Sequence, residues 1–128
     1  MGKIPGIAEK RCIESFRAAL GGTPVVSPCT FDFLRGDPTP SRPLGAKLPV
    51  DAYFPAYSLV IEYMGEQHSR PNRMMDRWPG RRDQRARYQA RRTELLELNG
   101  IRLIRVWHTE VINEELIRAK LREVGIGI

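Results

Sequence analysis

The chain has 128 residues, the length of a single domain that can bury a hydrophobic core. Its 41% hydrophobic and 28% charged residues are typical of a folded globular protein and argue against a disordered chain or a fibre. No apolar run approaches the roughly 18 residues that span a bilayer, and the start has no signal-peptide core. We therefore expect one intracellular domain, residues 1–128, without a membrane partner, cytoplasmic and associated with the nucleoid if the protein is bacterial.

Hydrophobic spacing predicts alternating helices and strands. The predicted elements are a helix over 8–20, short strands at 25–26 and 29–34, strands 50–54 and 59–64, a helix over 81–98, a strand over 101–107 and a helix over 110–124. The proline-containing segments 36–48 and 65–80 are predicted loops. The order αβ(β)ββαβα indicates an α/β fold, a mixed β-sheet flanked by helices.

Positive charge is concentrated between residues 69 and 92, where nine arginines occur with two acids and no lysine. A guanidinium is always charged and binds phosphate oxygens in pairs, so this tract predicts a nucleic-acid surface. The alternative, a solvated helix face, is weakened because such faces usually interleave acids. The predicted contacts are Arg70, Arg73, Arg77, Arg81, Arg82 and Arg85, with Trp78 as a side chain that stacks on bases.

The hairpin over 50–64 holds the candidate chemistry. Glu62 interrupts an apolar strand, and a turn centred between residues 56 and 57 makes positions that sum to 113 face each other, which pairs Asp51 with Glu62. Two opposed carboxylates repel unless a positive charge lies between them. A divalent cation, Mg²⁺ or alternatively Mn²⁺, would offset this repulsion, and a main-chain carbonyl near Tyr63 and waters would complete its coordination shell. Such an ion suits phosphodiester hydrolysis. The alternative is an edge hairpin whose carboxylates point to water.

These residues resemble a known family. Residues 48–68 read LPVDAYFPAYSLVIEYMGEQH, similar to the core of the PD-(D/E)XK nucleases and, more narrowly, to the branch of very-short-patch-repair and homing-type endonucleases. Residues 94–106, ELLELNGIRLIRV, are similar to that branch's closing helix and strand, and the first helix, with Glu9 ahead of Ile13 and Phe16, matches its opening helix. The resemblance covers residues 6–111 and implies a restriction-endonuclease-like fold.

The resemblance also implies roles for individual residues. Asp51 would be the shared metal ligand, Glu62 the second acid, and His68 a general base or a metal-proximal group acting on the attacking water. Supporting roles would fall to Glu9, with Glu14 as the alternative acid of the first helix, to Gln67, which would orient a water or phosphate, and to Arg92, which would contact the scissile region.

Two positions depart from the family pattern. Met64 stands two residues after Glu62, where relatives carry Lys or Asp, and Gln89 stands where relatives often place an acid, for which Asp83 would substitute. The expected function is a metal-dependent DNA endonuclease that nicks, or cuts both strands as a homodimer. The alternative is a catalytically impaired DNA-binding or assembly module. RNA stays open as a substrate because phosphate contacts read charge rather than sugar.

Overall fold

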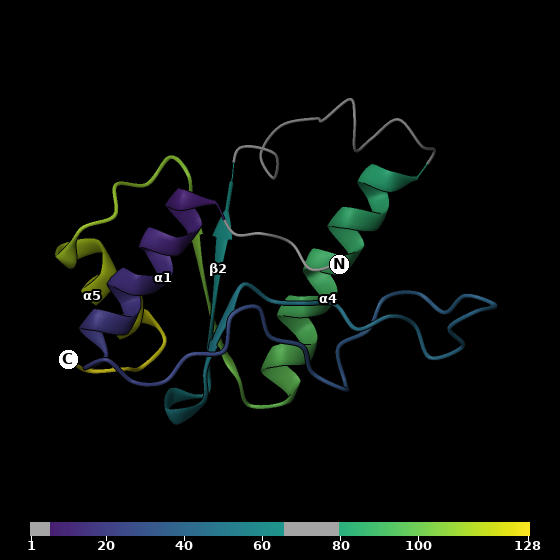
Figure 1. The fold of residues 1–128 in the computed structure, drawn as a ribbon, viewed down its shortest axis with the longest axis horizontal. Coiled ribbons are helices and arrows are strands. Elements are labelled where there is room, and N and C mark those ends of the chain that lie inside the picture. The colour runs from purple at the N-terminus through teal and green to yellow at the C-terminus, as the bar shows by residue number, and fades with distance from the viewer. Residues whose placement is uncertain (1–5, 66–79) are drawn as a thin grey trace.

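The computed structural model describes residues 6–65 and 80–128, apart from the side chain of Arg81 (Figure 1). The described chain is a mixed α/β fold, as predicted. Its elements are α1 (Ile7–Ala19), β1 (Ala52–Phe54), the 3₁₀ turn η1 (Pro55–Tyr57), β2 (Leu59–Met64), α4 (Arg81–Leu98), β3 (Arg102–Trp107) and α5 (Glu114–Glu123). None of the helices in these ranges is long and apolar enough to cross a membrane.

The sheet has the order β1-β2-β3, with β1 antiparallel and β3 parallel to β2. Ala52 pairs with Ile61 and Phe54 with Leu59, so the predicted register, in which positions sum to 113, is confirmed. On the other side of β2, Glu62 pairs with Arg105. The side chains that meet at the C-terminal end of β2 are determined by the β1–β2 turn and its register, and by the parallel crossover through α4.

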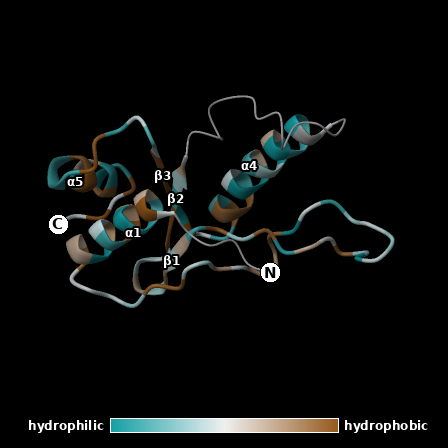
Figure 2. Cartoon of the chain, turned by 45° about the horizontal axis from the view of Figure 1, so that its top comes forward, coloured by the Kyte–Doolittle hydropathy of each residue, from teal (hydrophilic) through white to brown (hydrophobic). Residues whose placement is uncertain are grey.

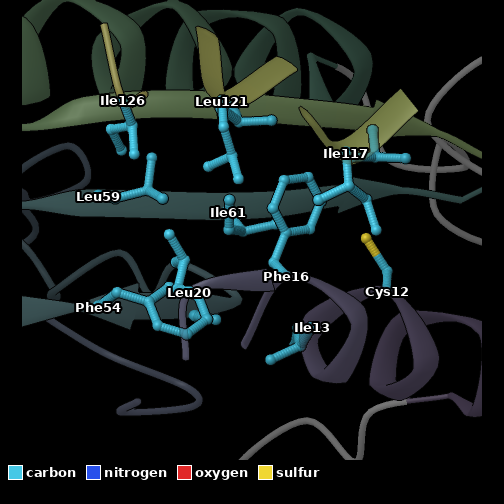
Figure 3. Packing of buried hydrophobic residues seen from close by; sticks show 13 residues of the cluster. Cys12, Ile13, Phe16, Leu20, Phe54, Leu59, Ile61, Ile117, Leu121 and Ile126 are labelled. Atoms are coloured by element: carbon cyan, nitrogen blue, oxygen red, sulfur yellow. The ribbon is translucent and has the colours of Figure 1, made fainter. Parts of the chain in front are cut away.

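Helices cover both faces of the sheet (Figure 1). Alternation along β2 sends Leu59 and Ile61 toward α1 and α5, and Val60 toward α4. The first face carries the larger core cluster, built around Phe16, Phe54 and Leu121 (Figure 3). The second cluster consists of Leu34, Leu48, Val50, Val60 and Leu96. In Figure 2 the part of α4 furthest from the strands is mostly hydrophilic, as its arginines require.

The predicted strands at 25–26 and 29–34 are wrong. Val26 forms an isolated bridge with Tyr53, and Cys29 with Val50, without a continuing ladder. Pro24 and Pro28 lack the N–H groups that a strand would donate at these points. The last helix begins at Glu114 rather than at residue 110, because the Asn113 side chain caps it by accepting from Leu116 N.

Residues 35–47 form an arm that extends past α4 (Figure 1). Its two sides meet at the Arg35–Lys47 bridge and its tip closes at the Thr39–Arg42 bridge. Gly45 has a φ of +82°, and a Cβ there would lie 2.0 Å from the carbonyl oxygen of Gly36, so only glycine lets the two sides approach this closely.

Asp37 attaches the arm to α4. Its carboxylate forms ion pairs with Arg87 and Arg91, and its backbone N–H donates to Tyr88 Oη over 2.8 Å. Hydrogen bonds from these arginines lower the pKa of Asp37. Arg87 and Arg91, two arginines of the basic tract, are therefore paired with a carboxylate within the fold.

We expect Asp37→Asn to loosen the arm, because both ion pairs lose their charge. Chymotrypsin should then cleave after the exposed Leu44 of the arm faster than in the unmodified protein, as followed by mass spectrometry. The matched control is Glu114→Gln, which removes an exposed ion pair with Arg118 on α5, outside the arm. Equal cleavage rates in the two variants would contradict the assigned attachment.

Candidate functional site

Asp51 and Glu62 lie together at the end of the β1–β2 hairpin that is away from the turn. Continuing the β1–β2 register by one pair places Asp51 opposite Glu62, and Asp51 Oδ2 accepts a hydrogen bond of 2.8 Å from Tyr63 N. Glu62 is only 7% exposed. The predicted juxtaposition is therefore present in the structure, and the alternative of a hairpin with both acids in solvent does not describe Glu62.

Burial raises the pKa of Glu62, and the neighbouring Asp51 charge raises it further. Two guanidinium groups, those of Arg92 and Arg105, act in the opposite direction. An unpaired carboxylate at this depth would cost several kcal/mol, and the two arginines offset part of the effect of burial on the pKa of Glu62.

Arg105 is the residue of this site that sequence reasoning missed. Its Nε lies 3.3 Å from Glu62 Oε1. Its two terminal nitrogens donate to Thr93 Oγ1 over 2.7 Å and to the Gln89 carbonyl over 3.1 Å. The available signal was an arginine at an inward position of an otherwise apolar strand, but its partner becomes evident only once β3 is known to lie beside β2.

Arg92 was predicted to contact nucleic acid, and the structure places it against Glu62. Its Nε lies 3.8 Å from Glu62 Oε2 and donates to the Pro49 carbonyl over 3.2 Å. The side chain is 20% exposed, so it reaches both the buried carboxylate and the surface of α4.

Glu9 lies in the first turn of α1 and is 6% exposed, whereas Glu14 is exposed and forms an ion pair with Arg17. Of the two acids considered for this helix, Glu9 is thus the buried one. Both Glu9 and Asp51 act electrostatically on Cys12, a second residue that the sequence did not single out. Glu9, Cys12 and Asp51 therefore lie near one another in the fold.

Burial raises the pKa of the Cys12 thiol to about 12, and the Asp51 and Glu9 carboxylates add to the shift. Only the thiolate reacts with alkylating reagents, so we expect Cys12 to resist iodoacetamide at pH 8 in the folded protein and to react in urea. Cys29, which is partly exposed, should react first. Mass spectrometry of labelled peptides measures both rates, and rapid labelling of Cys12 in the folded protein would contradict its placement.

Several predicted residues lie outside the described ranges: His68, Gln67, Arg70, Arg73, Arg77 and Trp78. The side chain of Arg81 is likewise outside them. On α4, Arg82 is exposed and Arg85 is partly buried. Met64, the departure from the family pattern, is buried at the end of β2.

The donor atoms at this site suit a hard divalent cation. Asp51 and Glu62 supply carboxylate oxygens. The N–H of Tyr63 points toward Asp51. Because the N–H and the carbonyl of a strand residue point to the same side of the strand, the Tyr63 carbonyl also faces the Asp51 side of β2. Within residues 6–65 and 80–128, no group of three or more His, Cys, Asp and Glu side chains is placed to hold a metal ion. A cation here would therefore rely on two carboxylates, main-chain oxygen and water.

Comparison with protein-family models, with curated proteins and with solved structures finds no match to this chain.

Proposed function

We propose that this protein is a metal-dependent endonuclease of the PD-(D/E)XK type that hydrolyses phosphodiester bonds in DNA, in the cytoplasm. The observation that carries the proposal is the buried Glu62 carboxylate beside Asp51, at the end of a hairpin whose sequence resembles that family. A buried carboxylate beside a second acid is costly for stability, which is typical of sites retained for chemistry.

In the proposed site, Asp51, Glu62 and the Tyr63 carbonyl would hold Mg²⁺ or Mn²⁺. The bound ion would lower the pKa of a coordinated water and offset charge on the phosphate. His68 is proposed as the base that takes the proton from the attacking water, Gln67 as the group that orients water or phosphate, and Glu9 as the acid that supports the site from α1.

The proposed grip on DNA lies along α4 and the preceding residues of the basic tract. Arg82 and Arg85 belong to the described part of this surface, with Arg81 beside them. Arg87 and Arg91 are bound to Asp37, so they contribute less net charge than the sequence suggested. Phosphate contacts of this kind release counterions, so binding should weaken steeply with added salt.

We expect the double charge reversal Arg81→Glu/Arg82→Glu to weaken DNA binding and to flatten its salt dependence by about two in the log–log slope, because each lost phosphate contact removes about 0.9. Fluorescence anisotropy at several salt concentrations measures this. The control is Arg118→Glu on α5, which lies on the opposite face of the sheet. A slope equal to that of the unmodified protein would place the DNA surface elsewhere.

The experiment that tests the proposed activity is incubation with supercoiled plasmid in Mg²⁺, in Mn²⁺ and in EDTA. We expect nicked or linear DNA only with the metal ions, and the ratio of the two forms reports single-strand cutting or the action of a homodimer. Conversion that persists in EDTA, or salt-sensitive binding without conversion on plasmid, mismatched and RNA substrates, would contradict it.

The second candidate is a DNA-binding or assembly module with an impaired site. Two observations favour it: Met64 occupies the position of a familiar catalytic side chain, and both oxygens of Glu62 face arginines. Metal-independent binding without cleavage is the result that this candidate predicts.

A further inference from the structure

We infer that Arg92 is an exchangeable counter-ion of Glu62, which a divalent cation displaces and which then binds the phosphate of the substrate. This inference rests on the proposed function and assigns Arg92 a role beyond the general DNA grip. It follows from the contrast between the two arginines that face the same buried carboxylate.

Arg105 is fixed in place by three separate contacts. One nitrogen pairs with Glu62, and the other two donate to the side chain of Thr93 and the main chain of Gln89. All three groups lie on elements that pack together, since Arg105 belongs to β3 and both other partners belong to α4. Moving Arg105 would therefore break all three of these contacts. Arg105 thus acts as the permanent partner of Glu62.

Arg92 is held differently. Within the described part of the chain, its contacts run through Nε, at 3.8 Å from Glu62 Oε2 and 3.2 Å from the Pro49 carbonyl. The distance to Glu62 is longer than that of Arg105, and the side chain is long enough to swing while its helix stays in place. Moving Arg92 therefore breaks fewer of the described contacts than moving Arg105 does.

Charge balance gives the exchange its direction. The charged groups that act on Glu62 are Arg92, Arg105 and Asp51, and with both carboxylates ionised these four residues sum to zero without a cation. A divalent ion between the two carboxylates would leave an excess of positive charge in a partly buried place, which is unfavourable. The excess is relieved when Arg92 moves outward, and a phosphate group brought to the ion provides its new partner.

Mn²⁺ binding in the absence of DNA tests this directly, because the electron paramagnetic resonance signal of free Mn²⁺ falls as the ion binds. We expect Arg92→Gln to tighten Mn²⁺ binding by about tenfold, since the competing charge is gone. Arg92→Met is a second neutral variant that should behave alike, and Arg92→Lys, which keeps the charge, should stay close to the unmodified protein. Thermal unfolding of each sample establishes that it is folded.

The matched control is Arg91→Gln, the neighbouring arginine that pairs with Asp37 instead, and we expect unchanged Mn²⁺ affinity there. Equal affinity in the Arg92 variants and the unmodified protein would overturn the inference, provided that Asp51→Asn weakens Mn²⁺ binding. If Asp51→Asn has no effect on Mn²⁺ binding, the proposed metal site itself is wrong, so the two failures are distinguishable.

Discussion

Arg105→Ala is expected to lower the free energy of unfolding by about 3 kcal/mol, because it leaves the buried Glu62 carboxylate without its closest partner. Arg105 is 18% exposed at its side chain and joins β3 to α4 through Thr93 and Gln89, so the variant also removes contacts between these elements. Urea unfolding followed by circular dichroism measures the change.

Two further variants separate the buried charge from general damage. Arg118→Ala removes an exposed arginine from an i,i+4 pair on α5 and should cost no more than about 0.5 kcal/mol. Glu62→Gln in the Arg105→Ala background should recover part of the lost stability, because a neutral amide is less costly to bury than a carboxylate. Equal stability of Arg105→Ala and Arg118→Ala would show that Arg105 does not neutralise Glu62.

Asp51→Asn is expected to reduce DNA cleavage at least about a hundredfold, since even residues that only support metal ligands cost 10–100-fold when changed. The amide oxygen still accepts the hydrogen bond from Tyr63 N, so the hairpin and the proposed DNA surface on α4 should be preserved. Cleavage of supercoiled plasmid in Mn²⁺ and anisotropy with a duplex measure the two properties in the same samples.

Asp32→Asn is the matched control for Asp51→Asn. It neutralises an exposed aspartate whose carboxylate pairs with Lys47, and both properties should stay unchanged. Cleavage by Asp51→Asn at the rate of Asp32→Asn would remove Asp51 from the chemistry. Loss of DNA binding together with cleavage would instead indicate damage to the fold.

Local sequence signals predicted several elements well. The bounds of β2 and α4 agree with the prediction, because an apolar run and a helical pattern followed by Asn99-Gly100 mark their ends. The β1–β2 register followed from the length of the turn, and with it the meeting of Asp51 and Glu62. Short-range geometry was sufficient for these features.

Contacts between distant segments were beyond such reasoning. The Glu62–Arg105 pair depends on the parallel placement of β3 beside β2, which no local pattern specifies. Likewise, Asp37 contacts Arg87, which lies fifty residues later along the chain, so no local pattern predicts that the arm attaches to α4. The strand predictions at 25–34 failed because hydrophobic residues outweighed the prolines that interrupt the ladder.

The most direct test of the central claim is anomalous X-ray diffraction from crystals of the protein grown with Mn²⁺. The account predicts an anomalous peak in contact with carboxylate oxygens of both Asp51 and Glu62, with Arg105 still paired to Glu62. Mn²⁺ bound elsewhere, or no peak between these carboxylates at a concentration that supports cleavage, would contradict it.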